Sequence, residues 1–240
     1  MTSDLNKQIL TEQKGWSAPD SLEFYRSHRN TKDDLYESEK FFLPAVLQEV
    51  NSVLDVGCAA GGFSRIMKSF NPKLRYVGVD ITPELIETAR QDYPDSEFYV
   101  NDGVNFPFSA GSFDLVHCTG VLHVNSHYQE MLKAMWEQTN RYLLCDFRLT
   151  HTASVLGEIE IRFGENTQAT RLPYYIMNVD ELMVVVKTLL PAPALIRAKG
   201  YMHAVSPTAK IALDQVIMAF FLFEKGSSPT TIIELDLPGN

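Results

Sequence analysis

The chain has 240 residues, is 45% hydrophobic and carries a formal net charge of −9. That size and composition suit one large domain with a substantial core, or one domain with an inserted cap. The acidic balance argues against a broad electropositive surface for nucleic acid, and no apolar run approaches the ~20 residues that a membrane span needs.

The N-terminal region is polar at first and then helical in pattern. Its opening segment, MTSDLNKQILTEQKGW, lacks the basic and then apolar order of a signal peptide. Residues 20–50 predict one or two helices, and we expect residues 1–40 to form a helical lid over the domain at residues 41–240.

From residue 52 to residue 148, short apolar runs alternate with segments of helical periodicity. We expect strands at residues 52–57, 75–80, 96–102, 113–120 and 141–148, with helices at residues 61–70, 82–93 and 125–139. Thr82 as N-cap and Pro83 at the first helical position mark the start of the second helix. This alternation predicts an α/β fold with a doubly wound, mostly parallel sheet.

The C-terminal third follows a different pattern. We expect a helix at residues 179–190 and an antiparallel pair of strands at residues 194–205 and 215–225, which brings the sheet to seven strands. Residues 151–178 fit no repeat of the alternation and are expected to form an inserted cap beside the sheet's C-terminal edge. Residues 226–240 are expected to be a loosely held tail.

The three cysteines are Cys58, Cys118 and Cys145. They lie in or beside apolar runs, are odd in number and show no CxxC spacing. We therefore expect reduced thiols in a cytoplasmic protein, with no disulfide and no metal site.

The stretch SVLDVGCAAGGF, residues 52–63, passes from an apolar run into a loop of small residues. In a parallel sheet such a loop lies at the ligand-binding edge. Its glycines run Gly57, Gly61 and Gly62, so both the GK[ST] ending of a phosphate loop and the GxGxxG pattern are absent. The charge of Asp55 would repel a pyrophosphate and suits a ligand with an ammonium or sulfonium group.

VLDVGCAAGG resembles motif I of the class I S-adenosylmethionine-dependent methyltransferases, with Ala59 where many relatives have their middle glycine. FDLVHCTGVLHV resembles the fourth-strand signature of that family, whereas its usual LkPGG turn before the fifth strand is missing. The resemblance covers roughly residues 50–150. It implies a Rossmann-like fold, with S-adenosylmethionine as methyl donor and S-adenosylhomocysteine as product.

The resemblance also implies roles for particular residues. Asp55 would lie near the methionyl ammonium, Asp80 would accept hydrogen bonds from the ribose hydroxyls, and Asp102 would contact the adenine amino group. The remaining positions expected at the cofactor are Gly57, Cys58, Ala59, Gly61, Ile81, Gly103, Val104, Thr119, Gly120, Tyr25 and Arg26. Tyr25 and Arg26 would meet the methionyl carboxylate, with a weaker claim for Tyr36. The alternatives are capping or turn carboxylates for the three acids and a small buried residue for Cys58.

Catalytic and acceptor residues are less well marked. His123 is a candidate general base, His127 is a weaker one, and packing or capping is the alternative for both. Arg148 and His151, next to Asp146, are candidates for binding a polar or anionic acceptor, and a local ion pair is the alternative. Arg171, Tyr174 and Tyr175 would line the acceptor pocket from the cap or else form the core of the cap.

The sequence therefore predicts a methyltransferase that acts on an oxygen or nitrogen of a small-molecule acceptor, in secondary or sugar metabolism. A protein or RNA methyltransferase, a non-catalytic S-adenosylmethionine-binding protein and a nicotinamide dehydrogenase are the alternatives. We expect neither a membrane nor a nucleic-acid partner, and a monomer or a homodimer.

Overall fold

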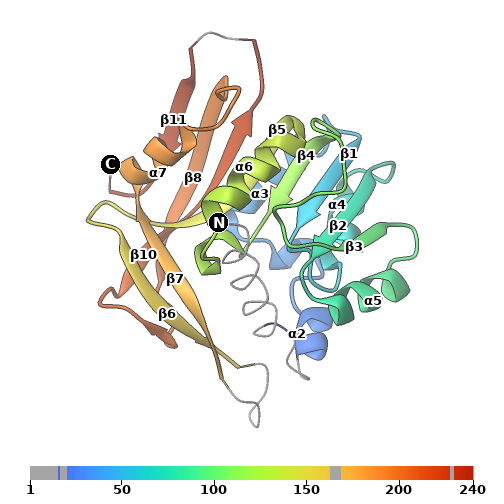
Figure 1. Cartoon of the computed structure of the whole chain (residues 1–240), viewed down its shortest axis with the longest axis horizontal. Helices are drawn as coiled ribbons and strands as arrows, with labels where there is room; N and C mark the ends of the chain where they lie inside the picture. The colour runs from blue at the N-terminus through green and yellow to red at the C-terminus, as the bar shows by residue number, and fades with distance from the viewer. Residues whose placement is uncertain (1–15, 17–20, 163–168, 228–229, 240) are drawn as a thin grey trace.

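The computed structural model of the protein describes residue 16 and residues 21–162, 169–227 and 230–239. Its centre is a twisted sheet with strand order β11-β8-β10-β5-β4-β1-β2-β3 (Figure 1). The strands of this sheet are β1 (Ser52–Val56), β2 (Arg75–Asp80), β3 (Glu97–Val100), β4 (Phe113–Cys118), β5 (Thr139–Thr150), β8 (Leu195–Ala204), β10 (Gln215–Glu224) and β11 (Ile232–Asp236). Strands β1 to β5 are parallel, and β10 runs antiparallel to both β5 and β8.

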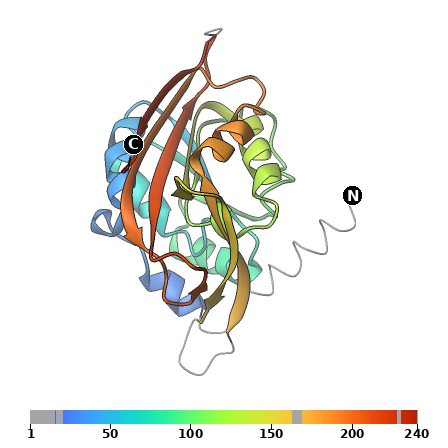
Figure 2. The same ribbon diagram turned by 90° about the vertical axis from the view of Figure 1, so that its left-hand side faces the viewer.

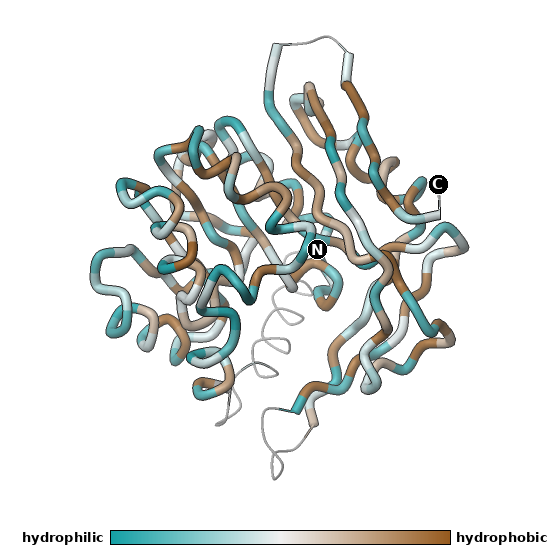
Figure 3. Tube along the Cα trace, turned by 180° about the vertical axis from the view of Figure 1, so that it is seen from behind, coloured by the Kyte–Doolittle hydropathy of each residue, from teal (hydrophilic) through white to brown (hydrophobic). Residues whose placement is uncertain are grey.

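Helices cover both faces of the sheet, as expected for a doubly wound fold. They are α2 (Ser21–Ser27), η1 (Lys32–Asp34), α3 (Glu37–Val46), α4 (Gly62–Phe70), α5 (Pro83–Asp92), η2 (Leu122–Val124), α6 (Tyr128–Gln138) and α7 (Val179–Val186). Helices α3, α4 and α5 share one buried apolar cluster with the sheet, while α6 and α7 share another. The central strands are largely apolar and the outer loops largely hydrophilic (Figure 3).

The segment predicted as an inserted cap, residues 151–178, contains two antiparallel strands of a β-hairpin beside the main sheet. Strands β6 (Val155–Ile161) and β7 (Thr170–Asn178) pair antiparallel, and the two-residue strand β9 (Ala209–Lys210) joins β6. The end of β7 pairs with the end of β5, so this hairpin continues from the main sheet. The prediction of a doubly wound, mostly parallel α/β sheet is confirmed, although the hairpin was not expected.

The prediction of a loose C-terminal tail is wrong. Residues 232–236 form β11, which pairs in parallel with β8 and adds an eighth strand to the predicted seven (Figure 2). Arg197 pairs with Glu234 at 2.7 Å, and the Leu237 side chain, 6% exposed, packs into the main core. Backbone pairing with β8 and the buried side chain of Leu237 therefore hold this segment at the edge of the sheet.

This packing predicts unequal effects of two substitutions near the C-terminus. Leu237→Ala should lower the free energy of unfolding by about 2–4 kcal/mol, because it leaves a cavity in the core. Ile232→Ala, at a side chain 57% exposed, should change it by less than about 0.5 kcal/mol. Urea unfolding followed by circular dichroism measures both, and equal effects would contradict the packing of Leu237.

Candidate active site

A cavity of about 230 Å³ lies at the carboxyl ends of β1, β2, β3 and β4, where α/β proteins bind their ligands. Helix α2 and the segment after it close one side of this cavity. Nine of the residues predicted at the cofactor line it: Tyr25, Gly57, Ala59, Asp80, Ile81, Asp102, Gly103, Thr119 and Gly120. The sheet therefore brings together residues from four successive strand ends.

The loop after β1 is held against the end of β2 by backbone hydrogen bonds. Gly57 N–H and Cys58 N–H both donate to the Val79 carbonyl, at 2.8 and 3.0 Å. Gly57 has φ +78°, and a Cβ there would lie 2.4 Å from Val121. Only glycine fits this position, since a side chain would be strained and would also collide with the loop after β4.

Asp80 links this loop to the next one. Its two carboxylate oxygens accept hydrogen bonds from Ala59 N–H at 3.0 Å and Thr82 N–H at 2.9 Å. Burial raises the pKa of Asp80, and these two donors oppose that shift. A carboxylate has about four lone-pair sites, so Asp80 can still accept hydrogen bonds from two hydroxyls in the cavity.

Asp102 lies in the cavity wall, but its oxygens already accept hydrogen bonds from its own turn. Val104 N–H donates to it at 2.9 Å, and Asn105 donates through both its backbone N–H and its side chain at 2.7 Å. Burial alone raises the pKa of Asp102, but these donors outweigh burial and hold the pKa below its usual value. Val104 packs against the core and does not line the cavity, so its predicted contact with the base is not supported.

Asp55 lies behind the loop, contrary to the predicted place beside the methionyl ammonium. The residue is 1% exposed, and its carboxylate accepts hydrogen bonds from Tyr76 Oη and, at 2.7 Å, from His117 Nδ1. Alternation along β1 turns Asp55 to the side opposite Val56, which does line the cavity. His117 is the cross-strand partner of Asp55 in β4, and this register was the signal that sequence reasoning missed.

Two further loop residues lie outside the cavity lining. The Cys58 side chain is buried behind Gly78, and burial raises the pKa of its thiol well above the usual value. Gly61, with φ +82°, is the N-cap of α4 and faces the rings of Phe98 and Tyr93. Both residues pack behind the loop and do not face the cavity. For Cys58 this agrees with the alternative of a small buried residue.

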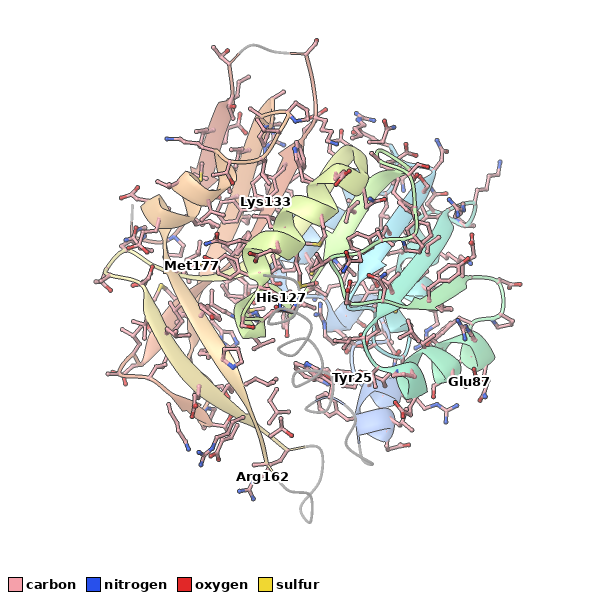
Figure 4. The ribbon with its side chains drawn as sticks, viewed as in Figure 1. Tyr25, Glu87, His127, Lys133, Arg162 and Met177 are labelled. Carbon is pink, nitrogen blue, oxygen red and sulfur yellow. The ribbon has the colours of Figure 1, made fainter. Side chains whose placement is uncertain are left out.

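The N-terminal lid places Arg29 in the site, where Arg26 was predicted. Arg26 pairs with Asp92 on the surface through contacts of 2.9 and 2.7 Å. Arg29 follows the end of α2 with φ +55°, which turns its side chain into the cavity wall. Tyr25 lines the same wall, where burial and then the charge of Asp80 raise its pKa (Figure 4).

Arg29 is held on several sides. Its guanidinium donates to Thr119 Oγ1 at 3.2 Å and to the fully buried Glu39. It also lies over the rings of Tyr36 and Phe63, 4.1 and 4.9 Å from their centroids. Sequence reasoning missed Trp16, Phe24, His28 and Arg29 in the lining, because helical periodicity does not show how the chain turns after α2.

Neither candidate base lines the cavity. His123, in η2, is buried edge-to-face against Tyr174, with 5.6 Å between ring centroids. Burial, aided by the charge of Arg148, lowers the pKa of His123 to about 3, which makes it a poor proton acceptor. His127 precedes α6, and its backbone N–H donates to Asn125 at 3.0 Å. These positions suit the alternative of packing and capping histidines.

Asp146 and Arg148 form the local ion pair that was the alternative to acceptor binding. The pair is buried, with 2.5 Å between Arg148 Nη1 and Asp146 Oδ2, and the second oxygen of Asp146 accepts Gly120 N–H at 2.7 Å. Burial alone raises the pKa of Asp146, but Arg148 reverses that effect and holds the pKa below its usual value. The ion pair therefore supports the Gly120 turn of the cavity wall.

Three residues predicted at the acceptor lie elsewhere. His151 is exposed and contacts the Pro238 carbonyl at 2.8 Å, while Arg171 pairs with Glu160 at 3.1 Å on the outside of the hairpin. Tyr175 contacts Tyr128, 5.5 Å between centroids, beside a second cavity next to α6 and α7. Alternation along β7 explains the difference: Leu172, Tyr174 and Ile176 are buried, and the residues between them face the other side.

Burial of His123 predicts a pH dependence of stability. The unfolded chain takes up a proton at the usual pKa of 6.5, and the folded chain does so only at about 3. The neutral His123 side chain therefore contributes fully to the free energy of unfolding above pH 6.5. This contribution is lost as the pH falls toward 3, by up to about 1.4 kcal/mol per pH unit. His123→Asn should flatten this part of the curve in urea unfolding, whereas His151→Asn should not. Parallel curves for His123→Asn and the wild type would contradict it.

Within the described residues, no helix is long and apolar enough to span a membrane, and no three His, Cys, Asp or Glu side chains are grouped to hold a metal ion.

Residues 53–142 match the family model of a methyltransferase domain. A demethylmenaquinone methyltransferase of Thermotoga maritima is 36% identical over 73 residues, 30% of this chain and 32% of that protein. A malonyl-[acyl-carrier protein] O-methyltransferase of Legionella pneumophila is 36% identical over 77 residues, 31% of this chain and 27% of that protein.

The chain thus spans about a third of the length of these curated relatives. An S-adenosylmethionine-dependent methyltransferase from Methanosarcina mazei superposes with a TM-score of 0.58 at 16% identity, covering 81% of this chain and 99% of that chain, which shows a common fold. Together with the residues at the strand ends, these matches confirm the predicted resemblance. Residues 53–142 therefore correspond to a methyltransferase domain, and the chain shares the fold of an S-adenosylmethionine-dependent methyltransferase.

Proposed function

We propose that the protein transfers a methyl group from S-adenosylmethionine to an oxygen or nitrogen of a small-molecule acceptor and releases S-adenosylhomocysteine. The observation that carries this proposal is the Asp80 carboxylate at the end of β2, facing the cavity beside the glycine loop. A carboxylate there suits the two ribose hydroxyls of a nucleoside.

In this proposal the adenosine part of that cofactor would lie at the ends of β2 and β3. Asp80 would accept hydrogen bonds from the ribose, and Ile81 and Leu85 offer apolar contacts to the base. Gly103 has φ +76°, and a Cβ there would lie 2.5 Å from Met131. The turn that contains Gly103 therefore packs tightly against Met131 beneath the adenosine end of the cavity. Asp102, already bound by its own turn, would have only a spare lone pair for the adenine amino group.

The other end of the cavity suits the methionyl part. Arg29 is the one arginine or lysine among the described lining residues, and we assign it to the methionyl carboxylate in place of Arg26. Glu39 holds the Arg29 guanidinium in direction and so acts as a positioning residue. A Cβ at Gly120 would meet no atom within 4 Å, which leaves room at the Thr119–Gly120 turn for the group that carries the methyl.

Bound S-adenosylmethionine supplies an electrophilic methyl carbon, and the transfer is an in-line displacement. The chain must therefore align the acceptor behind that carbon and exclude water. The lid residues Tyr25, Arg29 and Tyr36 cover the cavity from one side, and Val124 and Asn125 border it near the Gly120 turn. A lid over the methyl-transfer end supports a small acceptor.

Isothermal titration calorimetry tests the donor. The wild-type protein should bind S-adenosylmethionine and S-adenosylhomocysteine but not NAD. Asp80→Ala should weaken both by at least about tenfold, since two hydrogen bonds to a carboxylate are lost. Glu84→Ala, on the exposed face of α5, is the matched control and should bind like the wild type. Failure of the wild type to bind either compound would refute the proposed function.

A second titration tests the arginine assignment. Arg29→Met should weaken S-adenosylmethionine binding by about tenfold or more, because a buried charge-assisted contact is lost. The same variant should bind 5′-methylthioadenosine, which lacks the amino-acid end, nearly as the wild type does. Arg26→Met should leave both affinities unchanged, and a larger loss with Arg26→Met than with Arg29→Met would reverse the assignment.

A further inference from the structure

The cavity runs along the strand ends, so its two ends belong to different strands. Asp80 and Asp102 line it at the ends of β2 and β3, and Thr119 and Gly120 line it just after β4, on the other side of β1. With the nucleoside held at β2 and β3, the acceptor would approach at the turn after β4. We call this part of the cavity, at Thr119 and Gly120, the transfer end.

Tyr36 lines the cavity near the transfer end. The Arg29 guanidinium lies 4.1 Å from the centroid of the Tyr36 ring and also donates to Thr119 Oγ1 at 3.2 Å. Tyr36 and Arg148 interact electrostatically as well, and the ion-pair partner of Arg148 accepts a hydrogen bond from the turn after β4. Two separate interactions therefore place Tyr36 beside the transfer end and away from the nucleoside end.

The backbone and ring of Tyr36 are held in place, whereas its hydroxyl is available to a ligand. Tyr36 N–H donates to Glu39 at 2.7 Å, and the ring packs against a buried apolar cluster and the Arg29 guanidinium. Within the described part of the chain, no residue forms a hydrogen bond with Tyr36 Oη. A phenol hydroxyl both donates and accepts, so Tyr36 can bind a polar atom of a ligand in the cavity.

The other described groups at the transfer end favour a hydroxyl over an amine. Val121 and Val124 line the cavity beside the turn and offer apolar contacts. The carboxylates of the described lining, Asp80 and Asp102, lie at the nucleoside end. A protonated amine at the transfer end would therefore lose its hydration without gaining a carboxylate partner there. A hydroxyl loses less hydration and can share a hydrogen bond with Tyr36.

We infer that the acceptor presents a hydroxyl oxygen to the transfer end, and that Tyr36 Oη forms a hydrogen bond with this hydroxyl and so selects hydroxyl acceptors over amines. This inference rests on the proposed function, since it takes the turn after β4 as the place of methyl transfer. The rival role for Tyr36 is a contact with the methionyl carboxylate, which the same experiment detects.

Three analogues of S-adenosylhomocysteine test the inference without a known acceptor. In each, a tertiary amine replaces the sulfur and carries an arm in place of the methyl group: 2-hydroxyethyl, propyl or 2-aminoethyl. Isothermal titration calorimetry with the full chain at neutral pH measures the affinities. The wild type should bind the hydroxyethyl analogue at least about threefold more tightly than the propyl analogue. It should bind the aminoethyl analogue, whose arm ends in an ammonium, at least about tenfold more weakly than the hydroxyethyl analogue.

Tyr36→Phe removes the hydroxyl and keeps the ring beside Arg29. Its affinity for the hydroxyethyl analogue should fall by about fivefold or more, because the hydroxyl of the arm loses its partner, and the propyl analogue should then bind more tightly. Its affinities for S-adenosylhomocysteine and for the propyl analogue should stay within about twofold of the wild type.

Tyr99→Phe is the matched control, because it removes the same hydroxyl from an exposed residue of β3 outside the described cavity lining. It should leave every affinity within about twofold of the wild type. Circular dichroism establishes that Tyr36→Phe is folded; if it is not, the order of the three analogues in the wild type decides.

Tighter binding of the propyl or the aminoethyl analogue by the wild type would overturn the inference, as would failure of all three analogues to bind. A folded Tyr36→Phe variant that still prefers the hydroxyethyl analogue would also contradict it. An equal loss for S-adenosylhomocysteine and all three analogues would assign Tyr36 to the methionyl carboxylate instead. Absence of S-adenosylhomocysteine binding by the wild type would refute the proposed function, so the two failures are distinguishable.

Discussion

The hydrogen bonds that converge on Asp80 organise this molecule. Ala59 N–H and Thr82 N–H both donate to its carboxylate, so one side chain holds the loop after β1 and the turn before α5 in a fixed relation. The carbonyl of Val79, one residue earlier, accepts Gly57 N–H and Cys58 N–H. The end of β2 is therefore the anchor for the cavity floor, and the lid and the later loops are arranged around it.

The buried network of Asp55, Tyr76 and His117 has a complementary role. It lies under the same loop and connects neighbouring strands through side chains rather than through the backbone ladder. In the motif, Asp55 is the residue that most suggests a cofactor contact, yet its hydrogen bonds go to the protein. A carboxylate so enclosed fixes the position of the strand on which the glycine loop depends.

The fold was largely predictable because its pattern is local. Alternating apolar runs and helical periodicity located β1 to β5 and their helices, and the cap and start signals at Thr82 and Pro83 set the beginning of α5. The tail was not predictable, because β11 depends on a partner strand far away in sequence. Of the site, the strand-end residues Asp80, Ile81 and Gly120, which the family resemblance implied, do line the cavity.

The remaining parts of the site depend on the direction in which each side chain points, which the spacing of residues in the sequence does not show. Arg26 and Arg29 are the same type of residue, three positions apart, so the sequence does not distinguish them. The left-handed backbone at Arg29 decides which of the two lines the cavity. Tyr174 and Tyr175 are adjacent, and the register of β7 with β6 decides which one is buried. Burial then removes His123 from the candidates for a base, which composition could not show.

The length of β5 has a consequence for how such a protein can diversify. One stretch of this strand pairs with β4, and its last two residues, Leu149 and Thr150, pair with the hairpin strand β7. The family match ends at residue 142, before Asp146 and Arg148 are reached. The hairpin and the end of β5 can therefore change without disturbing the ends of β1 to β4, which line the cavity.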